Sequence, residues 1–187
     1  MSNLTKQAIR TSFWKLLDER PLSKITVKDI TDACGINRNS FYYHYPDIPT
    51  LIQEILADEV QRIIGEYPTI DSIEDCFRVS VAFAMENKRA ILHVYNSVNR
   101  DLFEQYLWQS CEESVKAYFS TVAAGVSLRE EDTNYLIRYQ TCELFGVISS
   151  WLRDGMRWDM AAFLHRMYEL RRGTFQEMVR RCAGSDL

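Results

Sequence analysis

The side chains best suited to recognition chemistry gather in one short stretch near the N-terminus. It opens with the polar run NRNS at residues 37–40 and continues with the ring-bearing run FYYHY at residues 41–45. Asn, Arg and Ser side chains form the hydrogen bonds that read base edges and hold phosphates. Tyr and His add further phosphate donors on rigid stems. This combination predicts a nucleic-acid contact.

The residues before this stretch predict a short helix that ends in a tight turn. Thr26 is a good N-cap, and Asp29 three residues later completes a pair that resembles a capping box. The helix should run from Val27 to about Cys34. Gly35 tolerates the left-handed backbone conformation that ends a helix and turns the chain at once.

A second helix should carry the polar and aromatic runs. Asn37 can cap it, and Pro46 should stop it, so the expected helix spans residues 38–45. Two short helices joined by such a turn form a helix-turn-helix, whose second helix faces bases with its N-terminal residues. The alternative is a buried aromatic helix. We expect Phe41 and Tyr45 to be core residues, but one helix cannot also bury the three rings between them in a small domain.

The segment ITVKDITDACGINRNSFYYHYPDIPTLIQEIL resembles the N-terminal DNA-binding signature of the TetR (tetracycline repressor) family. The likeness covers about residues 5–60 and lies in the order of the Thr-capped helix, the Gly-hydrophobic turn and the aromatic run. It implies a homodimeric transcriptional repressor that a small-molecule effector releases from a palindromic DNA operator. Asn39 departs from the small residue usual in the family, and Ile48 replaces a Lys that often holds a phosphate.

The DNA contacts expected on this basis divide into two groups. Arg38 and Asn39 are assigned to base readout, since Arg favours guanine and Asn favours adenine. Lys24, Thr26, Ser40 and Tyr42 are assigned to phosphates. The full predicted set is Lys24, Thr26, Asn37, Arg38, Asn39, Ser40, Tyr42, Tyr43 and His44.

Composition and charge agree with a small basic head on an acidic body. The net charge of the chain is −4, but residues 1–50 carry seven basic and five acidic side chains. No apolar run approaches the ~18 residues of a membrane span, and no signal peptide is evident, so we expect a cytoplasmic protein with no membrane partner.

The sequence contains no arrangement typical of catalysis or metal binding. The five cysteines lie far apart and without metal-binding spacing, so we interpret them as buried thiols, with a redox sensor as the alternative. Nucleotide-binding, hydrolase and zinc-protease motifs are also missing. We therefore predict no enzyme activity, no cofactor and no metal. A helical protein-interaction module, and a carrier or enzyme using the aromatic body without DNA binding, stay open as alternatives.

The periodicity of apolar residues predicts an all-α protein of two domains. A helix at about residues 4–19 joins the helix-turn-helix in a DNA-binding domain at 1–48, and a connecting helix follows at 49–65. The second domain, at 70–183, should bind the effector and dimerise. Its expected helices lie at about 71–87, 89–98, 101–124, 129–153 and 159–182, the last interrupted at Gly173.

The resemblance implies an effector pocket in the helical body, and aromatic residues there are its candidate lining. An apolar or aromatic effector suits such a wall, although core packing would explain each residue as well. The predicted contacts are Phe83, His93, Tyr95, Trp108, Cys111, Tyr118, Tyr139, Phe145 and Trp151.

The segment ELFGVISSWLRDGMRWDMAAFL resembles the dimerisation region of the same family, in which two helices of each subunit form a four-helix bundle. The last two long helices are apolar on more than one face, which indicates burial on more than one side. An intrachain bundle is the alternative. The predicted interface residues are Leu144, Val147, Ile148, Trp151, Phe163, Met167 and Leu170.

Overall fold

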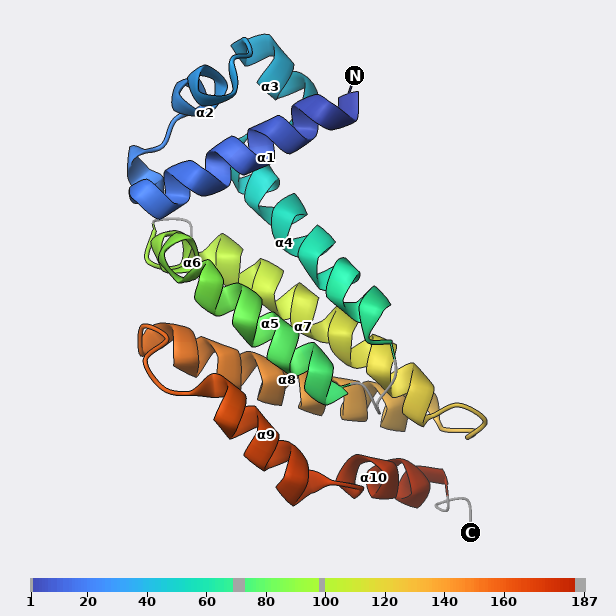
Figure 1. Ribbon diagram of the computed structural model, residues 1–187. Helices are drawn as coiled ribbons and strands as arrows, with labels where there is room; N and C mark the ends of the chain where they lie inside the picture. Colours follow the sequence, from blue (N-terminus) through green and yellow to red (C-terminus); the bar gives the residue numbers. More distant parts are fainter. Residues whose placement is uncertain (1, 69–72, 98–99, 184–187) are drawn as a thin grey trace. The chain divides into compact units, whose positions relative to one another are not determined.

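The computed structural model describes residues 2–68, 73–97 and 100–183, and its regular structure within these ranges is entirely helical (Figure 1). The helices are α1 Ser2–Glu19, η1 Leu22–Lys24, α2 Val27–Cys34, α3 Arg38–His44, α4 Ile48–Glu66, α5 Ile73–Glu86, α6 Lys88–Tyr95, α7 Arg100–Val122, α8 Glu130–Arg153, α9 Met160–Arg171 and α10 Thr174–Ala183. The predicted all-α class is confirmed. The expected start of one helix at residues 71–72, the end of the next at 98, and the start of the second domain at 70 lie outside the described residues.

Side-chain caps define the starts of the N-terminal helices. Thr26 and Asp29 form a complete capping box at α2, and the Asn37 side chain accepts a hydrogen bond from the amide of Ser40 at α3. The amide of Thr50 donates to Asp47 Oδ1 at 2.8 Å near the start of α4. Each cap is a local interaction, which explains why these starts could be predicted from the sequence.

The C-terminal helix predicted from residue 159 to about 182 is divided in two. Gly173 has a φ of 78°, a left-handed conformation that no α-helix can contain. As a result α9 ends at Arg171 and α10 starts at Thr174.

The chain divides into two compact units. Unit 1 contains Met1–Glu59 and Glu86–Tyr106, and unit 2 contains Val60–Met85 and Leu107–Leu187. In this grouping α6 belongs with the N-terminal helices, because it packs on α1. His93 Nδ1 lies 2.6 Å from the carbonyl oxygen of Leu17, a contact between residues 76 positions apart.

The core of unit 1 is built on one stripe of α1 and on the inner face of α3. Its fully buried members include Ile9, Phe13, Leu17, Ile30, Phe41, Tyr45 and Leu51. The three α1 residues repeat every four positions, so they lie on one face. Arg10 lies beside them and ties the helices together, because its Nε donates to the Tyr45 hydroxyl at 3.1 Å and its Nη2 to Glu54 Oε1 at 2.6 Å.

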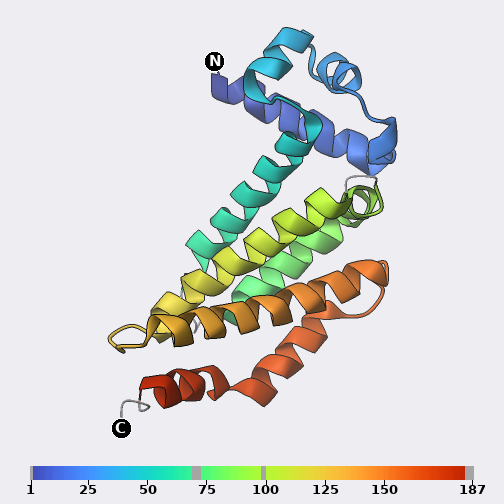
Figure 2. The ribbon, with the colours of Figure 1, turned by 180° about the vertical axis from the view of Figure 1, so that it is seen from behind.

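Unit 2 contains the long helices of the body. Figures 1 and 2 show α8 running alongside α5 and α7, with α9 and α10 following it in the chain. Aromatic contacts join these helices: Trp108 of α7 meets Phe145 of α8 with ring centres 5.4 Å apart, and Phe119 meets Phe175 at 5.8 Å. Among the described helices, none has the length and apolarity needed to cross a bilayer.

The capping box predicts a pH-dependent contribution to stability. Hydrogen bonds from the side chain and backbone of Thr26, and then the charge of Arg20, hold the pKa of Asp29 below its ordinary value. A carboxylate with a lowered pKa stabilises the fold at a pH above its unfolded pKa of about 4, and this stabilisation is lost as the pH falls through its folded pKa.

The wild type should therefore unfold at a higher urea concentration than Asp29→Asn near pH 7, and the difference should shrink below about pH 4. Urea titrations across this pH range measure it. In a Thr26→Ala background the effect of Asp29→Asn should be smaller at neutral pH. An undiminished effect there would contradict the assignment to the cap.

Candidate functional site

The first turn of α3 is positioned by a side-chain cap and by two buried rings. Asn37 Oδ1 accepts from the backbone amide of Ser40 at 2.8 Å and lies 3.1 Å from its hydroxyl oxygen. From below, the buried rings of Phe41 and Tyr45 anchor the helix, with their centres 5.8 Å apart. Because the cap and the two rings hold the helix, the opposite face of α3 does not need to pack in the core.

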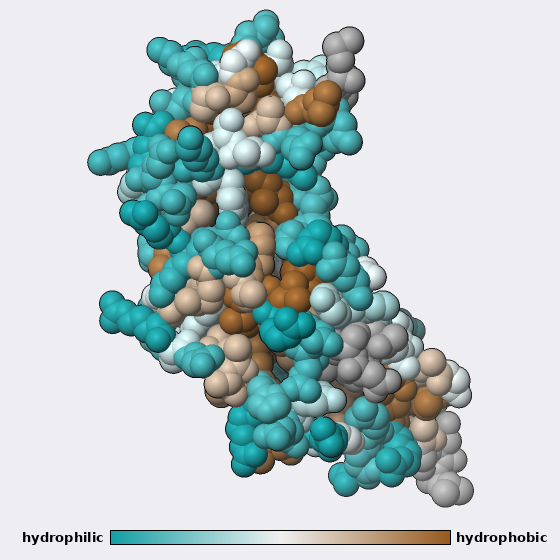
Figure 3. All heavy atoms as spheres, in the orientation of Figure 1, coloured by the Kyte–Doolittle hydropathy of each residue, from teal (hydrophilic) through white to brown (hydrophobic). Residues whose placement is uncertain are grey.

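That opposite face presents polar and aromatic side chains to solvent. Arg38 and Asn39 are exposed, and so are the rings of Tyr42 and Tyr43, with 54% and 80% of their surfaces accessible. Burial therefore does not explain why aromatic residues occur at 42 and 43. On the face shown in Figure 3, hydrophilic side chains cover most of the N-terminal helices at the top of the view.

A shallow hollow lies beside this face. It is lined by Thr5, Asn37, Asn39, Ser40, Tyr43 and His44, so α1 and α3 both contribute to it. The lining is mainly hydroxyl, amide and imidazole groups, which are typical hydrogen-bonding partners of nucleic-acid phosphates and bases. Thr5 reaches this hollow from α1 and lies outside the nine predicted contacts given above.

All nine predicted DNA contacts lie in unit 1 and at its surface. Ser40 and His44 are partly buried, and the other seven are exposed: Lys24, Thr26, Asn37, Arg38, Asn39, Tyr42 and Tyr43. Thr26 and Asn37 have a second role, since their side chains already cap α2 and α3.

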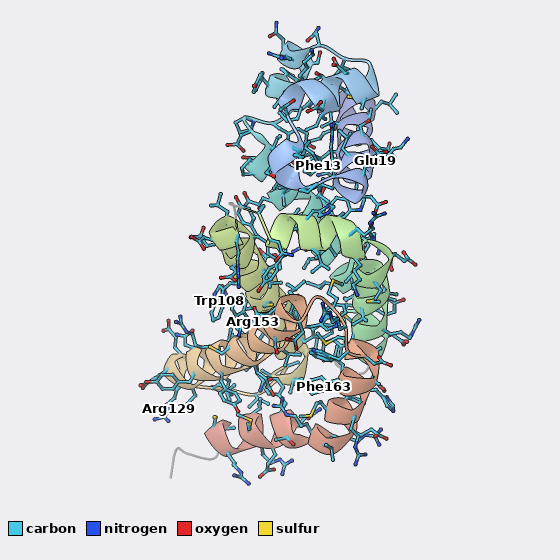
Figure 4. The ribbon with its side chains drawn as sticks, turned by 90° about the vertical axis from the view of Figure 1, so that its left-hand side faces the viewer. Phe13, Glu19, Trp108, Arg129, Arg153 and Phe163 are labelled. Atoms are coloured by element: carbon cyan, nitrogen blue, oxygen red, sulfur yellow. The ribbon has the colours of Figure 1, made fainter. Side chains whose placement is uncertain are left out.

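A cavity of about 440 Å³ lies within unit 2. Four helices face it with residues spaced three and four apart, as in the α8 series Gln140, Leu144, Val147 and Trp151. The α9 series Met160, Leu164, Met167 and Arg171 lies on another wall. Phe163, labelled in Figure 4, also lines this space from α9. The walls are mainly apolar, with a few polar side chains.

The polar groups of the cavity differ in how they are paired. Arg171 Nη1 donates to Glu143 Oε1, which joins α9 to α8 by an ion pair. The Tyr118 hydroxyl donates to the carbonyl oxygen of Tyr67, and burial raises the pKa of this tyrosine. Burial also raises the pKa of the Cys111 thiol to about 12, so Cys111 is a neutral thiol and a poor nucleophile at neutral pH.

The nine predicted effector contacts fall in three places. Cys111, Tyr118 and Trp151 line the cavity. His93 and Tyr95 belong to unit 1, where His93 contacts Leu17 and Tyr95 is buried. The other four belong to unit 2 but do not line the cavity: Phe83, Trp108, Tyr139 and Phe145.

The predicted dimer residues mostly face the interior of their own chain. Leu170 is 61% exposed and does not line the cavity. The six that line it are Leu144, Val147, Ile148, Trp151, Phe163 and Met167. The outward face of α8 carries a different series, whose exposed members include Tyr135, Tyr139, Cys142, Gly146 and Ser150 beside the charged Glu131, Arg138 and Arg153.

The polar lining residues Gln140, Glu143 and Arg171 were not predicted as effector contacts. A signal for them exists in the sequence, because each interrupts an apolar stripe at helical spacing. Such residues are also typical of solvated helix faces, and only the packing of α8 against α9 distinguishes the two cases. In the described part of the chain, no group of three or more His, Cys, Asp or Glu side chains gathers as a metal site would require.

Both parts of the chain match known protein families. Residues 13–55 match the family described as "Bacterial regulatory proteins, tetR family". Residues 71–173 match the TetR-type "Transcriptional regulator C-terminal region".

Curated relatives resemble part of the chain. The regulator EthR of Mycobacterium tuberculosis is 30% identical over 80 residues, which are 40% of this chain and 37% of EthR. The repressor KstR2 of Rhodococcus jostii is 38% identical over 55 residues, which are 29% of this chain and 27% of KstR2. The chain thus spans about a third of the length of these relatives.

Solved structures share the fold over nearly the whole chain. The dihydroxyacetone kinase operon activator DhaS has a TM-score of 0.72 at 14% identity, covering 92% of this chain and 97% of DhaS. A TetR regulator from Rhodococcus sp. RHA1 has a TM-score of 0.57 at 13% identity, covering 97% and 96%. Because the C-terminal family match alone spans more than half of the sequence, the chain belongs to the TetR family of bacterial transcriptional regulators.

Proposed function

We propose that this regulator represses transcription as a homodimer. Two copies of α3 bind a two-fold symmetric DNA operator, and a small molecule in the body cavity releases it. The exposed N-terminal face of α3 is the observation that carries the proposal, since Arg38 and Asn39 reach outward while Phe41 and Tyr45 hold the helix in place. A rigid helix of this kind can enter a major groove with its first turn against the bases.

Side-chain chemistry indicates which residues would contact bases and which would contact phosphates. Arg38 can form a bidentate pair with guanine and Asn39 with adenine. The hydroxyls of Ser40, Tyr42 and Tyr43, the ring of His44 and the ammonium group of Lys24 suit phosphates. Lys6 and Arg10 are less suited, because both form ion pairs with Glu54.

Selection of bound sequences from a random DNA pool tests the proposal directly. We expect a two-fold symmetric site with half-sites one helical turn apart, and an affinity that falls steeply with salt because phosphate contacts release counterions. Folded dimer that enriches no site, alone or with cell extract, would overturn DNA binding. A reporter gene downstream of the selected site tests whether the protein represses or activates transcription, since a repressor lowers the expression of the reporter.

Arg38→Ala should weaken binding to the selected operator by about 1–3 kcal/mol and relax specificity at one base pair. The reason is the loss of one bidentate base contact. Fluorescence anisotropy with the operator and with singly substituted sites measures both effects. Arg157→Ala, a change of an exposed arginine in unit 2, is the control and should leave affinity unchanged. Equal weakening on all sequences would show that Arg38 only contacts phosphate.

The dimer would use the outward face of α8. Tyr135, Tyr139, Cys142, Gly146 and Ser150 fall within one sector of the helix, opposite the stripe that lines the cavity. The small residues of this sector permit two helices to approach closely, and the two tyrosines supply contact area beside them. The exposed Leu170 of α9 could add to the same interface. Cross-linking through Cys142 with a short bis-maleimide tests the arrangement, and the monomer band of Cys142→Ser is its control.

A further inference from the structure

We propose that the body cavity takes a largely apolar molecule with a neutral head group that both donates and accepts a hydrogen bond, such as a primary amide or a hydroxyl. The inference rests on the proposed role of this cavity as the effector site and specifies the chemistry of the ligand. It is based on two side chains of α8, Gln140 and Glu143, which line the cavity.

These two side chains each have a buried polar atom without a partner. Gln140 Nε2 and Glu143 Oε2 are enclosed and form no hydrogen bond among the residues that the structure describes. A buried donor or acceptor without a partner is costly, so native proteins rarely keep one without a reason. One atom is a donor and the other an acceptor, and a spacing of three residues brings them to the same face of α8.

The ion pair of Glu143 determines the charge of a suitable head group. Glu143 Oε1 already binds Arg171, so the carboxylate and guanidinium neutralise each other locally. An anionic head group would lie against the unpaired oxygen of the Glu143 carboxylate, and a cationic one would add charge beside Arg171. A neutral amide avoids both costs: once the Gln140 and Glu143 side chains turn toward the cavity about their last torsion angles, its carbonyl can accept from Gln140 while its NH₂ donates to Glu143.

The rest of the lining favours an apolar tail. Hydrophobic side chains from several helices surround the polar pair, among them Leu144, Val147, Trp151, Phe163 and Leu164. Two further polar groups of the lining already form hydrogen bonds within the protein. The Tyr118 hydroxyl donates to the carbonyl oxygen of Tyr67, and the Ser114 hydroxyl donates to the carbonyl oxygen of Ser110 at 2.8 Å. A pocket with apolar walls and few open polar groups orients a ligand by its head group alone.

Three probes that differ mainly in the head group test the inference: 6-phenylhexanamide, 6-phenylhexanoate and pentylbenzene. Their affinities for the protein without DNA are measured by tryptophan fluorescence, because Trp151 lines the cavity, and by calorimetry. The amide should bind about tenfold more tightly than either of the others, as expected for one or two added hydrogen bonds. Tighter binding of the carboxylate, for example through the exposed Arg172, or equal binding of all three would overturn the inference.

Gln140→Leu separates a ligand contact from a structural role. It should lower the preference for the amide over the hydrocarbon about tenfold, while the thermal midpoint of the ligand-free protein stays the same or rises. A residue that only supports the fold would lower that midpoint. Gln109→Leu, which changes an exposed glutamine of α7 that does not line the cavity, is the matched control and should keep the preference.

Operator binding is measured separately, so that the two proposals can fail separately. If the amide binds with the expected preference but leaves operator affinity unchanged, the ligand class stands and effector release fails. If none of the probes binds up to its solubility limit while the operator binds normally, the ligand class is overturned and DNA recognition stands.

Discussion

Gly146→Arg is expected to convert the proposed dimer into monomers and to weaken operator binding by about 100-fold or more. A dimer places two copies of α3 on one operator, so the second half-site is bound at a high effective concentration that monomers lack. The expected loss follows from this linkage, because Gly146 itself belongs to unit 2, whereas the proposed DNA contacts belong to unit 1.

The fold of one chain should tolerate this change. Gly146 is exposed on the outward face of α8, and a Cβ added there would meet nothing within 4 Å. Arg is also a better helix former than Gly, by roughly 0.5–1 kcal/mol. The substitution therefore places a large charged side chain only where a second copy would pack.

Sedimentation velocity gives the oligomeric state of this variant, and anisotropy gives its operator affinity. Gly65→Arg is the matched control, since Gly65 is also an exposed helical glycine with open space around its Cβ position. It should stay dimeric. A dimeric Gly146→Arg protein with normal operator affinity would place the interface elsewhere and refute our use of the outward face of α8.

Phe41→Ala should lower the free energy of unfolding by about 3–5 kcal/mol, the cost of deleting a large buried ring and leaving a cavity. Phe41 is fully buried, and its ring centre lies 5.8 Å from that of Tyr45 and 5.6 Å from that of Tyr42. The loss should also abolish operator binding, because α3 would no longer be held with its first turn outward.

Urea unfolding followed by circular dichroism measures the change, and a matched variant on the same helix isolates its cause. Tyr43→Ala removes a ring that is 80% exposed, so it should change stability by less than about 0.5 kcal/mol while still weakening DNA binding. If the two variants were equally stable, the inner and outer faces of α3 would have been assigned wrongly.

The N-terminal helices could be derived from the sequence because local interactions define them. Thr26 with Asp29, Asn37 with Ser40 and Gly35 act over a few residues, so their types and spacing predict the caps and the turn that the structure contains. The burial of Phe41 and Tyr45 could also be predicted from the sequence, because a surface helix buries only one of its faces.

Tertiary structure decided which way the body helices face. The sequence of α8 contains two stripes, one through Leu144 and Val147 and one through Tyr139 and Gly146, and both are compatible with burial. The first stripe, which we predicted for the dimer, lines a cavity within the chain. The dimer interface itself stays a prediction. The grouping of His93 with unit 1 likewise depends on its proximity to Leu17, 76 residues away.

The sequence by itself thus determined the helical class, the capped helix-turn-helix and the exposure of Arg38, Tyr42 and Tyr43 on α3. The structure alone decided that Glu143 pairs with Arg171 at a cavity wall that Gln140 also lines, and that Tyr139 is exposed and does not line it. The physical reason is the range of the interactions. Caps and turns are made by neighbours in the sequence, whereas the direction of a helix face is chosen by the total apolar area that several distant helices bury together.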